Sequence, residues 1–281
     1  FSPNGEYVMI SQINKPFSYL VTYSRFPTET NIYNKDGDFV SNLQKVPLIE
    51  ELPKGFMSVR TGKRSFSWRP DKGASLTYVT ALDSGDPSKK VDFRDEVYEL
   101  NYPFSGKGKF ILKTINRFSG IDWGTKDMAI AYDTWWNTRN RKSYVFNPSN
   151  PNIKPKIISD RNYQDTYNDP GSFLRSRNEF NRSVLKMHYG NIFLRGQGFS
   201  PSGQFPFIDK VNTKTFEKTR VYQSSYTDKI ESIIDYDPKK NQLTVSIESP
   251  SEYPNYYTKK IKSGKLEKLT NLKNPFLELQ N

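Results

Sequence analysis

The chain has 281 residues, of which 35% are hydrophobic and 15% aromatic, and it carries a formal net charge of +12. So many aromatic residues exclude a disordered chain, because they supply the apolar surface that folding buries. The sequence contains no cysteine, which excludes disulfides, thiolate metal sites and a cysteine nucleophile, and no apolar run is long enough to span a membrane.

The positive charge could attract nucleic acid, an anionic membrane or acidic peptides. Lysine and arginine are scattered along the chain, however, and no block of five like charges occurs. We therefore interpret the charge as a soluble surface with a positive bias. An acidic ligand is the main alternative, and we expect neither nucleic acid nor a membrane as a partner.

Turns rich in Pro, Asn, Asp, Gly and Lys recur along the chain, each followed by a strand that alternates polar and apolar residues. The first lies in FSPNGEYVMIS at the start of the chain, and the second in FSWRPDKGASLTYV from Phe66. Further copies begin at Ile121, Leu174 and Ile233. The turn centres lie roughly 55 to 67 residues apart, which indicates a degenerate internal repeat.

Each repeat has room for four short strands and their turns. A four-stranded sheet that recurs at this interval is typical of a β-propeller blade, so the sequence predicts an all-β propeller fold. A β-sandwich is the second possibility, but it would show turns without a long period. The predicted strands are 64–68, 75–81, 95–100 and 109–115 in the second copy, and 229–235, 242–248, 256–262 and 266–270 in the fifth.

About five blades are visible, and the first copy lacks the strand that should precede its turn. Propellers normally close by pairing strands from both chain ends, which removes exposed sheet edges. We therefore expect residues 1–281 to form one partial propeller domain of a seven- or eight-bladed ring; a five-bladed ring closed by other means is the alternative.

Two segments interrupt the alternation. Residues 47–59 are expected to loop between blades with at most one helical turn. Leu266, Leu269, Leu272 and Phe276 have helical spacing, but the repeat favours an outer strand followed by a tail, with a short terminal helix as the alternative.

No motif for hydrolysis or for a metal site is found. GQGFSPSG (196–203) lacks the spacing of a hydrolase nucleophile turn and reads as a loop, and the single histidine, His188, has no serine placed for it by a motif. The acidic segments 34–38 and 165–171 lack the spacing of a calcium loop, so we interpret them as turns. We therefore expect no metal, no cofactor and no catalytic activity from the chain by itself.

Aromatic and arginine residues occur together in YSRFP (23–27) and around Trp135 and Trp136. Stacking on single-stranded nucleic acid is one interpretation. We favour aromatic core residues with arginines on the opposite strand face. Adjacent residues of a strand point to opposite sides, so one of the two tryptophans should be buried and the other should face a surface.

Several long phrases resemble the propeller of glutamyl endopeptidases, which belong to the prolyl oligopeptidase clan and include bacterial proteins and plastid enzymes of plants. The phrases are SYLVTYSRFP, SVRTGKRSFSWRPDKGASLTYV, GIDWGTKDMAIAYDTWWNTRNRKSYVFNP, DRNYQDTYNDPGS and LRGQGFSPSGQFPFIDKVNTKT. They occur in the family's order over nearly the whole chain.

The resemblance implies a catalytic α/β-hydrolase domain beyond Asn281, with the Ser, Asp and His of a serine peptidase, and a propeller that gates and shapes substrate access to it. Cleavage after glutamate would need cationic groups facing the cavity, because arginine pairs with a carboxylate through two hydrogen bonds. Arg25, Arg64 and Arg69 lie in the matching phrases and are the candidate substrate-binding residues.

One alternative function remains open. The chain could instead be a free-standing propeller that serves as a protein-interaction scaffold. Its richness in Lys, Asn and Tyr favours a bacterial source, with export to the periplasm preferred over the cytoplasm. The expected partners are the chain's own hydrolase domain and a peptide substrate that is possibly acidic.

Overall fold

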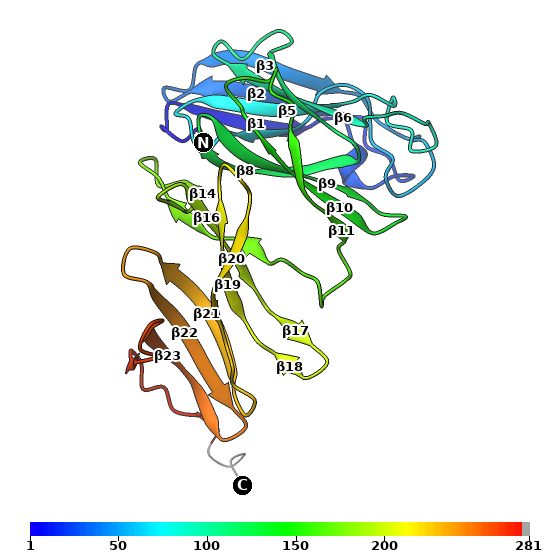
Figure 1. Ribbon diagram of the computed structural model, residues 1–281. Helices are drawn as coiled ribbons and strands as arrows, with labels where there is room; N and C mark the ends of the chain where they lie inside the picture. The colour runs from blue at the N-terminus through cyan, green and yellow to red at the C-terminus, as the bar shows by residue number, and fades with distance from the viewer. Residues whose placement is uncertain (277–281) are drawn as a thin grey trace. The chain divides into compact units, whose positions relative to one another are not determined.

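The computed structural model describes residues 1–276 and separates into two compact units (Figure 1). Unit 1 comprises Phe1–Asn162 and Arg177–Val184, and unit 2 comprises Tyr163–Ser176 and Leu185–Asn281. Across the described residues the fold is all-β, and its helical content is one 3₁₀ turn, η1 (Tyr23–Arg25). None of the described residues forms a helix long and apolar enough to cross a bilayer.

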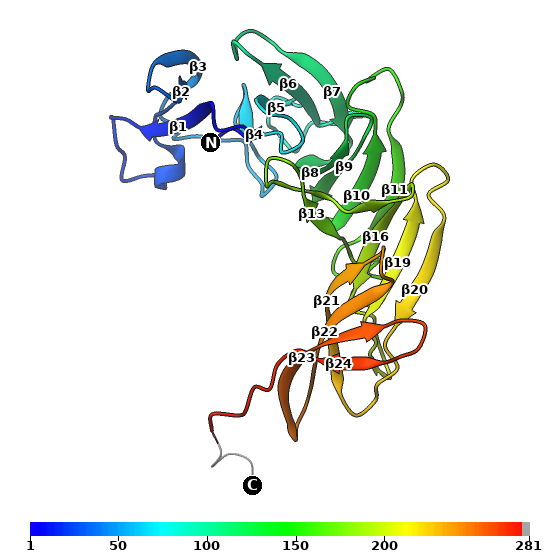
Figure 2. The same cartoon turned by 90° about the vertical axis from the view of Figure 1, so that its left-hand side faces the viewer.

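Unit 1 contains three antiparallel sheets in which strands that are consecutive in the chain are also neighbours in space (Figure 2). This meander order follows from the short turns, which bring each strand back beside the one before it. The first sheet has three strands: β1 (Tyr7–Ile13), β2 (Thr28–Asn34) and β3 (Phe39–Val46). The second has four: β4 (Arg64–Trp68), β5 (Ser75–Ala81), β6 (Asp95–Asn101) and β7 (Lys109–Thr114). The third has four: β8 (Arg117–Thr125), β9 (Met128–Trp135), β10 (Asn140–Phe146) and β11 (Lys156–Asn162).

Two hydrophobic clusters fill unit 1, each formed by side chains from successive sheets. Ile32 and Leu43 of the first sheet pack with Leu76 and Tyr78 of the second. Val79 and Val97 of the second sheet belong to a cluster whose remaining members come from β7 to β10. These are Ile111, Leu112, Trp123, Ala129, Ala131, Tyr144 and Phe146. Packing between successive antiparallel meanders is the arrangement that propeller blades adopt.

Unit 2 contains two further meander sheets. Its first has the strand order β12 (Ser172–Phe173), β16 (Asn191–Gly196), β19 (Phe207–Asn212) and β20 (Lys218–Gln223), and β15 (Met187–His188) also pairs with β16. The second consists of β21 (Ile230–Asp237), β22 (Gln242–Ser249), β23 (Glu252–Lys260) and β24 (Leu266–Lys268). Unit 2 also contains the hairpin of β17 (Phe199–Ser200) with β18 (Gly203–Gln204). A further hairpin, β13 (Arg175–Arg177) with β14 (Ser183–Leu185), has its turn in the segment Arg177–Val184 of unit 1.

Alternation in the sequence explains the position of the core in unit 2. Along β22 the side chains of Leu243, Val245 and Ile247 are buried, while the residues between them are only half-buried. These three pack with Phe193 and Ile208 of the preceding sheet. A period of two thus turns one face of the strand to the core.

The predicted all-β fold and its blade-like repeats are confirmed. The strands of the second and fifth repeats lie within a few residues of their predicted bounds. Residues 47–59 form a loop without a helix, and β24 is an outer strand followed by an irregular tail up to residue 276. How many blades the whole propeller has stays a prediction, as does the single domain.

The fourth repeat was placed incorrectly. The turn near residue 180 joins β13 to β14, which form a separate hairpin instead of the start of the sheet. The side-chain Oδ1 of Asn178 accepts hydrogen bonds from the backbone N–H groups of Phe180 and Arg182, so the turn is real. The turn that enters the second strand of this sheet lies at Tyr189 and Gly190, which both have positive φ.

Candidate functional site

Arg25 ends the η1 turn, in the irregular connection between β1 and β2. Its carbonyl oxygen accepts a hydrogen bond from the Ile49 N–H at 2.9 Å, which fixes the backbone. Its half-buried side chain forms no ion pair with any carboxylate of the described residues. The guanidinium of Arg25 is therefore free to pair with a carboxylate from elsewhere.

Several large apolar side chains precede this arginine in the sequence and face solvent. They lie in the same connection, which contains a cis bond between Lys15 and Pro16. We call this group the exposed aromatic segment, and it consists of Phe17, Tyr19, Leu20 and Tyr23, which are 59%, 109%, 83% and 73% exposed. Exposed apolar groups this close together are typical of interaction surfaces.

Arg64 lies at the start of β4, within an ionic cluster at one end of the second sheet. Its Nη2 lies 2.5 Å from Oδ1 of Asp95, but the alignment is not that of a hydrogen bond, and Nε and Nη2 lack an acceptor among the described residues. The Arg117 guanidinium bridges both carboxylates of the cluster, donating from Nη1 to Asp95 at 3.1 Å and from Nη2 to Asp83 at 2.7 Å. Arg94 adds a hydrogen bond to Asp83 at 2.8 Å.

This ionic cluster links three parts of unit 1. Asp83 follows β5, Asp95 begins β6 and Arg117 begins β8. The Nε of Arg117 also donates to the Met57 carbonyl at 2.8 Å, which holds the 47–59 loop. Burial opposes ionisation of Asp83, yet hydrogen bonds from Arg117 and Arg94 outweigh it and lower the pKa of this carboxyl.

Arg69 belongs to a second ionic cluster, at the opposite end of the same sheet. It is only 1% exposed. Its Nε and Nη2 donate hydrogen bonds to the two carboxylate oxygens of Asp71 at 3.1 and 2.7 Å. Its Nη1 lies 3.0 Å from Oε1 of Glu99. The guanidinium also stacks on the Trp123 ring, 3.8 Å from the ring centre. Every face of this side chain is thus occupied by the protein itself.

Glu99 is the central carboxylate of the second cluster. Besides its ion pair with Arg69, it accepts hydrogen bonds from Lys72 and Ser75 at 2.6 and 2.7 Å. Burial opposes its ionisation, but these hydrogen bonds and the Arg69 charge prevail and lower the pKa of Glu99. The structure therefore brings Arg64 and Arg69 to opposite ends of one sheet and places Arg25 in a different connection.

Trp135 ends β9 and Trp136 lies in the turn that follows, so the two tryptophans do not alternate within one strand as the prediction assumed. Trp135 is half-buried, and the Arg94 guanidinium stacks on it at 4.0 Å. Trp136 is 44% exposed and contacts the Phe56 ring, with 5.5 Å between ring centres. The Arg139 guanidinium, from the same phrase as the tryptophans, lies 3.8 Å from the centre of the Trp136 ring, so these two residues are not separated across a strand as expected.

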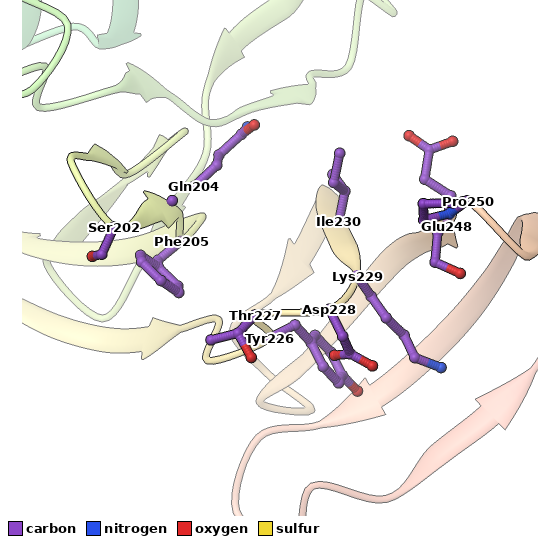
Figure 3. A pocket seen from close by; sticks show the side chains of 12 residues that line it. Ser202, Gln204, Phe205, Tyr226, Thr227, Asp228, Lys229, Ile230, Glu248 and Pro250 are labelled. Carbon is purple, nitrogen blue, oxygen red and sulfur yellow. The ribbon is translucent and has the colours of Figure 1, made fainter.

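Unit 2 has a pocket of its own, of about 490 Å³ (Figure 3). It lies between the β17–β18 hairpin, the β20–β21 connection and the β22–β23 turn. Phe205, Tyr226 and Ile230 supply apolar surface, and Asp228 and Lys229 supply charge of both signs. Ser202 and Ser249 also line the pocket, together with the carboxylate of Glu248.

The structure places the segments that superficially suggested catalysis or metal binding in turns and short strands. GQGFSPSG runs through β17 to the first residue of β18, and the His188 ring at the end of β15 lies 4.2 Å from the Tyr189 ring in a tilted contact. In the 34–38 segment, the Asn34 Oδ1 accepts hydrogen bonds from the N–H groups of Asp36 and Asp38, which closes the predicted turn.

Sequence reasoning missed most residues of the two ionic clusters. Asp83, Asp95 and Arg117 are far apart in the chain, and only the strand order brings them together. One signal was present: an acidic or basic residue lies just before or after several predicted strands. Such residues can meet, because the ends of neighbouring strands lie close together in a sheet.

No family model matches the chain. Two plant proteins do: it is 34% identical to a protein of Oryza sativa subsp. japonica named probable glutamyl endopeptidase, chloroplastic, over 294 residues and 99% of this chain. A protein of the same name from Arabidopsis thaliana is 31% identical over 295 residues and again 99% of this chain. The chain is homologous to a segment of these two proteins. This confirms the resemblance seen in the sequence.

The homology concerns one segment of those proteins, because this chain spans 31% of the length of each. Both named relatives are plant proteins, so they lend no support to a bacterial source, which stays a prediction.

Among solved structures, the β-propeller domain of the Trilobed protease from Pyrococcus furiosus is similar over 95% of this chain and 69% of that one, with 12% identity and a TM-score of 0.45. Pyrococcus horikoshii acylaminoacyl peptidase is similar over 97% of this chain and 38% of that one, with 10% identity and a TM-score of 0.42. The fold class rests on the strand order and packing described above.

Proposed function

We propose that this chain is part of the propeller domain of a serine endopeptidase related to the glutamyl endopeptidases, and that it gates and shapes access to an active site in a separate α/β-hydrolase domain. The observation that carries the proposal is the 34% identity along 99% of the chain to a protein three times as long. The blade-like sheets support a propeller, an architecture in which the blades surround a central channel.

Gating is a physical consequence of such an enclosure. A cavity above the active site admits only chains that fit through its opening, and it limits water around the acyl-transfer step. The propeller therefore contributes by selecting substrates for size while the hydrolase domain forms and breaks bonds.

Recognition of an acidic side chain is a finer part of the proposal. Of the three candidate arginines, Arg25 is favoured, because its charge is not compensated by a carboxylate of the described residues. Arg64 and Arg69 remain candidates, but Asp95, and Asp71 together with Glu99, already compete for their guanidinium groups. The proposed ligand is a peptide substrate with an acidic side chain.

The compartment is also a proposal. The named relatives are chloroplastic proteins. We propose that this protein works outside the cytoplasm, and that in a bacterium it is exported to the periplasm.

One observation favours the alternative function, a protein-interaction scaffold. The exposed aromatic segment offers apolar surface that peptide cleavage does not require.

Labelling of the catalytic serine distinguishes the two functions. The intact protein that carries this chain should react with a fluorophosphonate, because an activated serine attacks phosphorus as it attacks a carbonyl. Peptide mapping should place the modified serine outside residues 1–281. An intact protein that is folded but unlabelled would support the scaffold, and a label within residues 1–281 would contradict the proposed division of roles.

A further inference from the structure

The pocket of unit 2 contains two carboxylates that have no partner (Figure 3). Asp228 and Glu248 line it, and neither accepts a hydrogen bond or forms an ion pair with any of residues 1–276. Glu248 is half-buried, and a carboxylate that loses water without gaining a partner is destabilising. Both stay unpaired although the chain carries a net charge of +12, so the pocket is an acidic site on a basic protein.

The cation of the pocket is already bound. The Nζ of Lys229 donates a hydrogen bond to Oε1 of Glu252 at 2.7 Å, and this bond, with the charge of Asp228 as a further cause, raises the pKa of Lys229. The Nε2 of Gln204 donates to Oε1 of Gln197 at 2.8 Å, which leaves the Gln204 Oε1 without a donor among the described residues. Three carboxylates are therefore opposed by one ammonium group, and the charged and amide atoms that are still free to bind are acceptors.

Apolar surface lies beside one of these carboxylates. Ile230 and Glu248 are directly opposite each other in the β21–β22 pair, so their side chains lie on the same face of the sheet. Figure 3 shows both side chains directed toward the same side of the pocket. Ile230 is 48% exposed, and Phe205 and Tyr226 add aromatic rings. The pocket thus offers an apolar wall that ends at a negative charge.

A second lysine near the pocket does not neutralise it. The Nζ of Lys259 lies 5.0 Å from the centre of the Tyr226 ring, but it donates to Oε1 of Glu231 at 2.8 Å and to the Tyr222 hydroxyl at 2.5 Å. Glu231 is 1% exposed and balances the charge of this lysine. The ammonium group of Lys259 is therefore not available to the two unpaired carboxylates.

The walls of the pocket are fixed before any ligand binds. The β17–β18 hairpin pairs Phe199 with Gln204, and the Phe205 N–H donates to the Gly198 carbonyl at 2.9 Å. The volume of about 490 Å³ lies in the lower part of the range of ligand pockets, about 300–1,000 Å³. A site of this size suits one long side chain of a peptide.

We propose that this pocket binds an arginine side chain of a peptide. A guanidinium carries five N–H donors, no acceptor and a full positive charge, which matches a pocket whose free groups are acceptors. It pairs with the Glu248 carboxylate, with Asp228 adding negative charge, while its apolar stem lies along Ile230. The aromatic rings favour a guanidinium over an ammonium group, because arginine stacks on them. This site is separate from the recognition of an acidic side chain and does not rest on the proposed function.

Calorimetric titration of the intact protein tests the ligand. The probes are the acetylated, amidated tripeptides Ala-Arg-Ala and Ala-citrulline-Ala, because citrulline has nearly the shape of arginine without its charge. We expect the arginine peptide to bind at least about tenfold more tightly, since charge-assisted hydrogen bonds are the stronger ones. Equal affinity for the two peptides, or no binding of the arginine peptide at about 10 mM, would overturn the proposal. Tighter binding of Ala-Glu-Ala than of Ala-Arg-Ala would also overturn it.

Substitution of a carboxylate locates the binding. Glu248→Gln keeps the size of the side chain and removes its charge, so we expect the arginine peptide to bind at least about fivefold more weakly and the citrulline peptide to bind as before. Glu267→Gln is the matched control, because it removes an exposed carboxylate of β24 outside the pocket. Salt screens a distant charge, so the control should change the affinity by less than about twofold. Equal weakening by both substitutions, or by neither, would refute the site.

Discussion

Replacing Arg117 by alanine is expected to lower the free energy of unfolding of unit 1 by about 3–5 kcal/mol, because breaking a buried ion pair leaves uncompensated charge. Arg117 is 4% exposed and donates to Asp83 and Asp95, which are 1% and 0% exposed. The loss of unfolding free energy is measured by urea unfolding of the intact protein, monitored through hydrogen exchange of the β5 and β6 amides. Lys35→Ala is the control, since the Lys35–Glu6 pair is exposed and should contribute at most about 1 kcal/mol.

Acid should reduce the difference between the wild type and Arg117→Ala. The pKa of Asp83 is lowered in the folded protein, so the unfolded chain binds more protons between the two pKa values. The stability from this carboxylate is fully present above the unfolded value near 4 and is lost as the pH falls through the folded value. A difference that stays constant from pH 7 to pH 3, or a loss below about 1 kcal/mol at pH 7, would contradict the proposed role of the cluster.

Replacing Arg69 by alanine is the second change with a large expected effect, again a loss of about 3–5 kcal/mol in the unfolding free energy of unit 1. The substitution removes the cation that Asp71 and Glu99 share. It also removes the guanidinium that stacks on Trp123. Arg25→Ala is the matched control, because this half-buried arginine has no ion pair among the described residues; we expect a change within about 0.5 kcal/mol.

Cleavage selectivity separates the structural role of Arg69 from a substrate-binding one. If Arg69 or Arg64 selects substrates, its replacement by alanine should weaken cleavage after glutamate more than cleavage after other residues in the intact protein. We expect Arg25→Ala to weaken cleavage after glutamate more than cleavage after other residues. A stable Arg69→Ala protein with reduced selectivity for glutamate would instead assign Arg69 to substrate binding.

The repeats could be predicted from the sequence where turn chemistry and alternation agree. Pro70 to Gly73 separates two alternating runs, and β4 and β5 lie at the predicted positions. The fourth repeat was misplaced because Asn178 closes a genuine turn in a separate hairpin, whereas the turn that enters β16 uses Tyr189 at positive φ, a conformation for which tyrosine gives no signal.

The ionic clusters could not be predicted, because their partners are set by the order of strands. Asp83, Asp95 and Arg117 meet where β5 ends and β6 and β8 begin. The pairing of Arg69 with Asp71 lies within a single turn, yet its burial depends on Trp123 of the next sheet. The sequence showed that aromatic and basic residues recur together. It does not distinguish an arginine that stacks on an aromatic ring from one that lies on the opposite face of the strand.

The central claim is that this chain gates an active site located in another domain. The most direct test compares the kcat/KM of the intact protein for a glutamate-containing peptide of about ten residues with that for the same sequence in an exposed loop of a folded carrier protein. Gating predicts that kcat/KM for the carrier is lower by at least about tenfold, or ~1.4 kcal/mol in the barrier. Equal values for the two substrates would contradict the account.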